Sequence, residues 1–131
     1  MLSTSTHLVI TEFQNCLKQL HSTLSSAPLN QPKLKQTFEQ LKITFQTQIM
    51  RINASDFAPP VESKIQSYLT ETHKQIRLLE MDLKFLQASH QSTTFNTRLT
   101  QIQNRLDLLL SYGEAMLGVP ETGEKDDPQL P

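Results

Sequence analysis

Four histidines, one cysteine and thirteen carboxylates are the side chains of this chain that could bind a metal or perform acid–base chemistry. A di-metal site in a helical bundle needs Glu-x-x-His pairs that project inward, and the sequence contains no such pair. Glu71 and His73 are two residues apart, which places them on different sides of a helix. Glu80 and Asp82 are also two apart, about 200° around a helix, so they form no local acid–base pair. We predict no metal site, no cofactor site and no catalytic residue.

The glycines, serines and the cysteine give no sign of a nucleotide loop or a nucleophile. All three glycines lie at or beyond Gly113, and no serine has the flanking glycines of a nucleophile elbow. Cys16 is the one cysteine, so it cannot form an intramolecular disulfide, and we expect it to act as a small apolar residue on the inner side of its helix. The chain is therefore predicted not to be an enzyme.

Length and charge restrict the class of protein further. A chain of 131 residues fits one domain with a core of its own. The net charge of −1 argues against binding to nucleic acid. No apolar run is long enough to insert into a membrane, and the first residues lack the basic and apolar regions of a signal peptide. We therefore predict a cytoplasmic location.

Apolar residues recur at three- and four-residue spacing in four segments, which predicts four helices over about 5–24, 32–52, 59–90 and 95–117. Asn30 is a candidate N-cap, and hydroxyls at 92–94 are candidate caps for the last helix. Gly118 and Pro120 are typical of a helix end. The fold class is therefore all-α: an antiparallel four-helix bundle at 1–118 with a long C-terminal helical hairpin, and a disordered acidic tail at 119–131. The expected inner residues of the first helix are Val9, Phe13, Cys16, Leu20 and Leu24.

The third helix has a second apolar side, and one position on the fourth helix is unusual. Leu78, Met81 and Phe85 form a cluster away from the main stripe. Either the third helix is sandwiched between two others, or this side makes an intermolecular contact, of which a homodimer is the simplest form. Gly113 falls on the inner stripe, where it indicates either close approach of a neighbouring helix or a frayed end.

Charge is unevenly distributed along the chain. The second helix has four cations (Lys33, Lys35, Lys42 and Arg51) against Glu39, and the residues after 119 have an excess of carboxylates. This pattern fits either a solvated face with a solubilising tail, or a basic face that docks an acidic partner segment. Within the third helix, Glu80 and Lys84 have the i, i+4 spacing of a surface ion pair.

One part of the sequence carries a family resemblance. It consists of residues 75–92, QIRLLEMDLKFLQASHQS, with Arg98-Leu99, Arg105-Leu106 and the segment LLSY at 109–112. This part resembles the family of the cyanobacterial heterocyst-frequency control protein PatD, in which RLL-x-x-D-x-x-FLQ-x-x-x-QS precedes a leucine-rich last helix. The resemblance covers about the third and fourth helices.

The resemblance implies a small all-α cytoplasmic regulator of cell division. Its expected action is to bind the tubulin-like protein FtsZ, to promote FtsZ assembly and thereby to limit heterocyst differentiation. The alternative is a helical chaperone or assembly adaptor for another cyanobacterial complex, such as a photosynthetic or carbon-fixing one. No contact residues carry over from the family. From the character of the side chains, we predict six partner-binding residues: Lys35, Lys42, Arg77, Asp82, Phe85 and Gln87.

Overall fold

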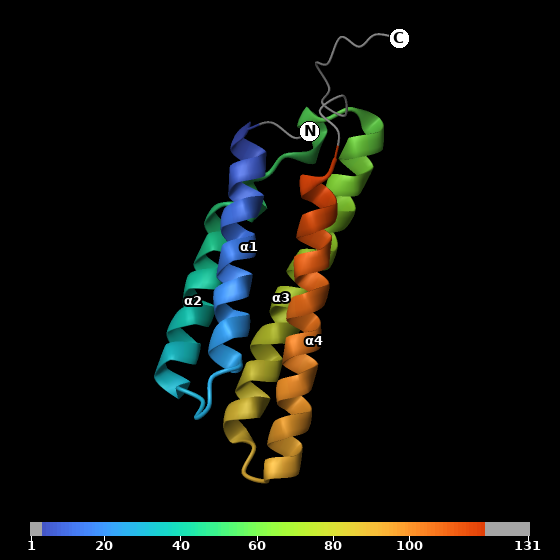
Figure 1. Ribbon diagram of the computed structural model, residues 1–131. Coiled ribbons are helices and arrows are strands. Elements are labelled where there is room, and N and C mark those ends of the chain that lie inside the picture. Colours follow the sequence, from blue (N-terminus) through green and yellow to red (C-terminus); the bar gives the residue numbers. More distant parts are fainter. Residues whose placement is uncertain (1–3, 120–131) are drawn as a thin grey trace.

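The computed structural model describes residues 4–119, and their long helices form an antiparallel bundle (Figure 1). The helices are α1 (Thr4–Leu24), α2 (Gln31–Thr47), α3 (Pro59–Ala88) and α4 (Ser92–Leu117). Two short 3-10 helices, η1 (Ile49–Arg51) and η2 (Ala54–Asp56), connect α2 to α3. The prediction of an all-α fold with four packed helices is confirmed.

Local sequence signals explain where α2 and α3 begin. The side chain of Asn30 accepts a hydrogen bond of 3.0 Å from the backbone N–H of Lys33, which satisfies one of the free donors at the start of α2. Prolines occupy the first turn of α3, where a missing N–H costs nothing. The prediction that a hydroxyl side chain caps the start of α4 is wrong, because Gln91 is the N-cap and its side chain makes no capping hydrogen bond. The hydroxyl residues at 92–94 lie inside the helix.

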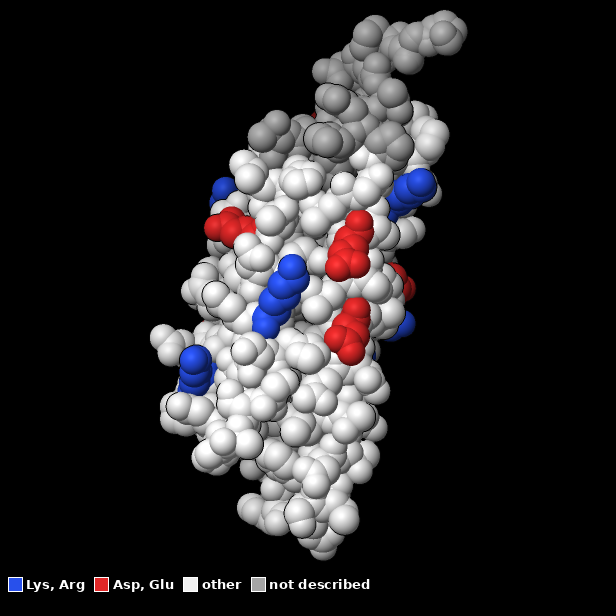
Figure 2. Space-filling model, viewed as in Figure 1, with Lys and Arg blue, Asp and Glu red and all other residues white. Residues whose placement is uncertain are grey.

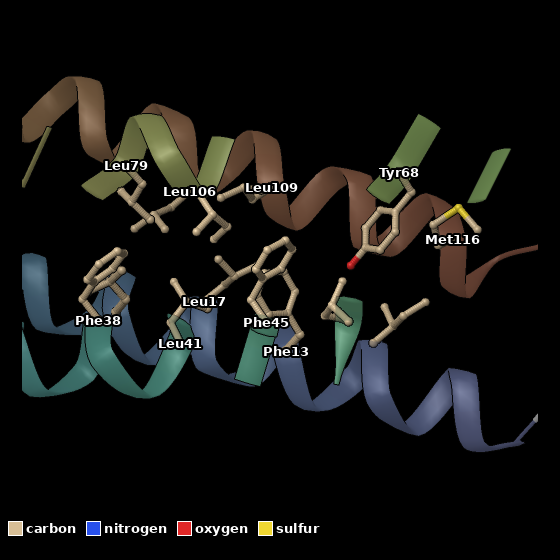
Figure 3. Close-up of a cluster of buried hydrophobic side chains, with 14 of the residues drawn as sticks. Phe13, Leu17, Phe38, Leu41, Phe45, Tyr68, Leu79, Leu106, Leu109 and Met116 are labelled. Carbon is tan, nitrogen blue, oxygen red and sulfur yellow. The ribbon is translucent and has the colours of Figure 1, made fainter. Parts of the chain in front are cut away.

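The helices form two layers, with α1 and α2 in one and α3 and α4 in the other (Figure 3). The closest helix contacts join α1 to α2, α1 to α4 and α3 to α4, whereas α2 and α3 approach each other less closely. The core runs between the layers. Among its labelled side chains are Phe13, Leu17, Phe38, Leu41, Phe45, Tyr68, Leu79, Leu106, Leu109 and Met116.

The buried side of α1 is wider than the predicted stripe. Ile10 and Leu17 are fully buried, whereas Val9 and Cys16 are half-buried. This difference follows from the packing of α1, which contacts both α2 and α4 and therefore buries two neighbouring stripes. The predicted core positions Phe13, Leu20 and Leu24 are buried as expected.

The ends of two predicted segments differ from the structure. The second helix ends at Thr47, five residues before its predicted end, and the apolar Ile49 continues its inner side from η1. Of the predicted tail, only Val119 lies inside the described residues, and it is buried in the core cluster. Within residues 4–119, no helix is both long and apolar enough to cross a membrane.

Gly113 marks a close approach between α1 and α4. It is buried, and α4 continues past it to Leu117, which excludes a frayed end. A Cβ atom at this position would lie 2.1 Å from Oε1 of Gln14, a side chain of α1 that is only 4% exposed. The Nε2 group of Gln14 donates a hydrogen bond of 2.9 Å to the carbonyl of Leu110. Glycine therefore makes room for an amide that ties α1 to α4.

Candidate protein-binding site

Apolar side chains remain exposed on the side of the α3–α4 hairpin that faces away from α1 and α2. On α3, Met81 is 51% exposed, Phe85 is 45% exposed and Leu78 is half-buried. On α4, Leu108 is 41% exposed. The predicted second apolar side of the third helix therefore exists, and the interpretation that other helices of the bundle sandwich it is wrong.

Two cross-helix contacts show that these residues share one face. The guanidinium of Arg98 lies 4.8 Å from the centre of the Phe85 ring, in a cation–π arrangement. One helix turn away, Nε of Arg105 donates to Oδ2 of Asp82 at 2.8 Å. Residues three and four apart are neighbours on a helix, so Leu78 and Phe85 flank Asp82. We call this face the outer hairpin surface, defined by Leu78, Met81, Asp82, Phe85, Arg98, Arg105 and Leu108.

The ion pair in the middle of the outer hairpin surface is partly sheltered from solvent. The exposed fractions of the side chains are 23% for Arg105 and 16% for Asp82. Arg105 also donates a hydrogen bond from Nη1 to the buried amide oxygen of Gln75. Because one guanidinium holds two acceptors of α3, it fixes the register of the hairpin.

A hollow lies at each end of the outer hairpin surface. The upper one, near the start of α3, has a volume of about 390 Å³, and its walls include Ser67, Glu71, Tyr112 and Met116. The lower one, near the start of α4, has a volume of about 280 Å³ and includes Arg98. The apolar residues therefore lie between a depression that is lined by both helices and one that is lined by α4 alone.

A second, smaller crevice separates α2 from α3. Its volume is about 120 Å³, and its walls include Lys35, Phe38, Glu80 and Gln87. Next to it, Nζ of Lys42 donates to Oε2 of Glu80 at 2.8 Å. This hydrogen bond raises the pKa of Lys42 and lowers the pKa of Glu80.

The structure separates the six predicted partner-binding residues into three groups. Lys35 and Gln87 line the α2–α3 crevice, and Lys42 is beside it in the ion pair with Glu80. Asp82 and Phe85 belong to the outer hairpin surface instead. Arg77 is exposed on α3, one turn from Met81, and forms no ion pair within the described part of the chain. Partner contact at these positions remains a prediction.

The sequence prediction missed the contribution of α4. Arg98, Arg105 and Leu108 complete the outer hairpin surface, and Tyr112 extends it to the upper hollow. These residues of α4 could have been found from their spacing in the sequence. With Gln101, they follow one another at three- and four-residue spacing and form a second stripe beside the inner one.

The face formed by α1 and α4 has a different character. Figure 2 shows the side on which α1 and α4 lie in front, where acidic and basic side chains are interspersed and the lower part shows no charged side chain. On the outer hairpin surface and its flanks, Lys64, Lys74, Arg77 and Arg98 are in no described ion pair, against the single unpaired carboxylate of Glu71. The exposed apolar residues are therefore bordered by positive charge.

No group of three or more metal-ligating side chains occurs in residues 4–119. Polar atoms do lie inside the core, however. The hydroxyls of Tyr68 and Thr72 and Oε1 of Gln14 are buried without a hydrogen-bond partner in the protein, and burial raises the pKa of Tyr68. Gln14 and Thr72 lie within the packed interior, whereas the side chain of Tyr68 also lines the upper hollow.

The fold and the surface together define an α-helical bundle with an exposed apolar and basic hairpin face. The family model of the CRR41 C-terminal domain matches residues 11–108 of this chain. The match covers most of the sequence, from the first half of α1 to the second half of α4, and the chain belongs to this family. No curated protein and no solved structure matches it.

This membership corrects the resemblance to the PatD family, which is wrong. The predicted binding of FtsZ and the limiting of heterocyst differentiation are wrong with it. The resemblance was misleading because it rests on a helical pattern of leucines. Residues 75–92 lie mostly on the amphipathic helix α3, and a pattern of leucines at helical spacing occurs in many helical hairpins. The family model matches three helices in full or in large part besides α3.

Proposed function

We propose that this chain is a non-enzymatic assembly adaptor, a helical module that binds a protein subunit of a larger complex through its outer hairpin surface. The observation that carries this proposal is the exposed apolar cluster of Met81, Phe85 and Leu108. These are half of the large apolar side chains that are exposed in residues 4–119. Apolar residues gathered on one face are typical of a protein interaction site.

The family supports the same class of function. CRR41 is implicated in the assembly or function of the chloroplast NDH complex. For this chain, we therefore propose association with a multisubunit complex, and we choose an NDH complex as the first candidate to test. The cytoplasmic location remains a prediction of the sequence.

The test compares two double variants in the native host. Affinity-tagged full chain is followed on native gels and density gradients, together with the subunits of the NDH complex. Met81→Glu with Phe85→Glu places two charges on the outer hairpin surface. Ile43→Glu with Met50→Glu is the matched control, because these residues are 50% and 51% exposed elsewhere on the bundle.

The expected result is co-migration of the unchanged chain and of the control with a complex or an assembly intermediate. The Met81 and Phe85 variant is expected to lose at least tenfold of the co-migrating fraction while it keeps its helical circular dichroism. Equal co-migration of both variants would show that the outer hairpin surface does not bind the complex. Migration of the unchanged chain at its own mass would contradict the adaptor function itself.

A further inference from the structure

The occupant of the outer hairpin surface can be inferred from the shape and the charge of that surface. We propose that it binds an acidic amphipathic helix of a partner protein, which lies along the groove between α3 and α4 as a third helix of the hairpin. This inference rests on the proposed adaptor function and adds the chemistry of the partner segment.

The groove between α3 and α4 has the shape and the length that a helix requires. The groove between two antiparallel helices accepts a helix whose apolar residues recur at three- and four-residue spacing. Here the groove begins at the upper hollow of about 390 Å³, beside Ser67, and ends where Arg98 lies on Phe85. Eighteen residues of α3 separate Ser67 from Phe85, which corresponds to about 27 Å. A partner helix of about five turns matches this length.

Apolar side chains along the groove match the apolar side of such a helix. The partner can place one large side chain in the upper hollow, against Tyr112 and Met116. Further along, its apolar side meets the exposed residues Leu108 and Met81. These contacts are interrupted by the ion pair between Asp82 and Arg105, which keeps the two helices of the groove at a fixed spacing.

The charges beside the groove favour an acidic partner. Lys64 lines the upper hollow and Arg98 lies on Phe85. Lys74 is one helix turn before Leu78, and Arg77 is one turn before Met81. Against these four cations, Glu71 is the one carboxylate beside the groove that is in no described ion pair. Asp82 is already neutralised by Arg105. An approaching helix with Asp and Glu beside its apolar residues is attracted, and a basic helix is repelled.

The same charges disfavour a second copy of this chain as the occupant. In a two-fold dimer, the same patch of both protomers meets. The excess of cations on the surface of one protomer would then face the same excess on the other. A homodimer through this surface would therefore bring like charges together across its contact.

The experiment is a selection from a displayed library of 18-residue helical peptides. Leucine is fixed at positions with heptad spacing, and the polar positions are drawn from Asp, Glu, Lys, Arg, Gln and Ser. The bait is the full chain. The first variant bait is Lys74→Glu with Arg77→Glu, both exposed and in no described ion pair. The matched control is Lys18→Glu with Lys33→Glu, which changes the net charge equally on α1 and α2.

The expected result is enrichment of Asp and Glu at the polar positions. The selected peptides should bind the Lys74 and Arg77 variant at least tenfold more weakly, and the control within about twofold. Raising salt from about 50 to about 500 mM should weaken their binding, because screening shortens the reach of the charges. Selection without a preference for acidic residues, or equal binding to both variants, would overturn the inference.

Two further outcomes identify other occupants, and each overturns the proposal. Binding to vesicles with anionic lipids, with no peptide enriched, assigns the surface to a membrane. A doubled mass in light scattering that the Met81→Glu and Phe85→Glu changes abolish assigns it to a second copy. If co-migration with the native complex depends on Met81 and Phe85 but the selection shows no preference for acidic residues, the adaptor function is supported and the proposal of an acidic helix is refuted.

Discussion

Replacing Gly113 by alanine tests whether the contact between α1 and α4 depends on the absence of a side chain. In an ordinary helix interior, this change stabilises a protein by about 1 kcal/mol, because alanine has the higher helix propensity. Here the new Cβ would lie 2.1 Å from Oε1 and 2.3 Å from Cδ of Gln14. The amide must therefore move away and give up its hydrogen bond to Leu110.

The magnitude follows from the cost of that displacement. Gln14 is 4% exposed, so its amide has little access to water once it leaves the carbonyl of Leu110. A buried polar group without its partner costs about 1–3 kcal/mol. Set against the gain in propensity, Gly113→Ala is expected to lower the free energy of unfolding by about 1 kcal/mol, or the melting temperature by about 4 °C.

A double-mutant cycle with Gln14→Ala isolates the contact. Without the amide, the new methyl group meets no obstacle, and Gly113→Ala should stabilise the protein by about 1 kcal/mol. The coupling between the two positions is therefore about 2 kcal/mol, measured by urea unfolding. Gly118→Ala is the control, because its Cβ would lie 3.6 Å from the nearest backbone oxygen at an ordinary φ of −86°. If Gly113→Ala stabilises the unchanged chain as much as it stabilises the Gln14→Ala variant, the reasoning is refuted.

Three other substitutions test the remaining polar contacts. Arg105→Met should lower the free energy of unfolding by about 2 kcal/mol in urea titrations, since it leaves the sheltered carboxylate of Asp82 unpaired; a loss below about 0.5 kcal/mol would contradict this role. Glu80→Gln should flatten the acid side of the pH–stability profile. The lowered pKa of Glu80 gives stability that is present above its unfolded value near 4.5 and is lost as the pH falls through the folded value. Tyr68→Phe should change thermal stability by less than about 1 kcal/mol, because the hydroxyl has no partner in the protein; a loss of several kcal/mol would show that it is hydrogen-bonded.

Much of the helix arrangement could be predicted because the signals are local. Asn30 caps α2 through its own side chain, and the prolines at 59–60 start α3 where a backbone donor is not needed. The last helix ends at Leu117, before Gly118, as its spacing predicts. Such signals act over a few residues, so one sequence is enough to find them.

The pairing of charges between helices could not be predicted in this way. The i, i+4 spacing favours Glu80 with Lys84, but the structure pairs Glu80 with Lys42 of α2. Asp82 likewise binds Arg105, which is 23 residues away in the sequence. Such pairs depend on which helices become neighbours, and the spacing within one helix contains no information about that.

Only part of the candidate site could be predicted, because the site also depends on which helices become neighbours. Phe85 and Asp82 were predicted from the character of α3, and both lie on the outer hairpin surface. Whether the second apolar side of α3 is covered depends on where α2 lies. Because α2 packs mainly against α1, it leaves the far side of the α3–α4 hairpin open. Arg98 and Leu108 were missed because their stripe on α4 gains significance only beside α3.

The exposed apolar residues alone are too few to hold a partner tightly. Burying a fully exposed large apolar side chain yields about 1.5–3 kcal/mol, and Met81, Phe85 and Leu108 are already about half buried. Their remaining contribution is therefore about 1 kcal/mol each. A micromolar complex needs about 8 kcal/mol after the cost of association. The upper hollow and the bordering cations must supply the difference, so binding at the outer hairpin surface should depend strongly on salt and on the charge of the partner.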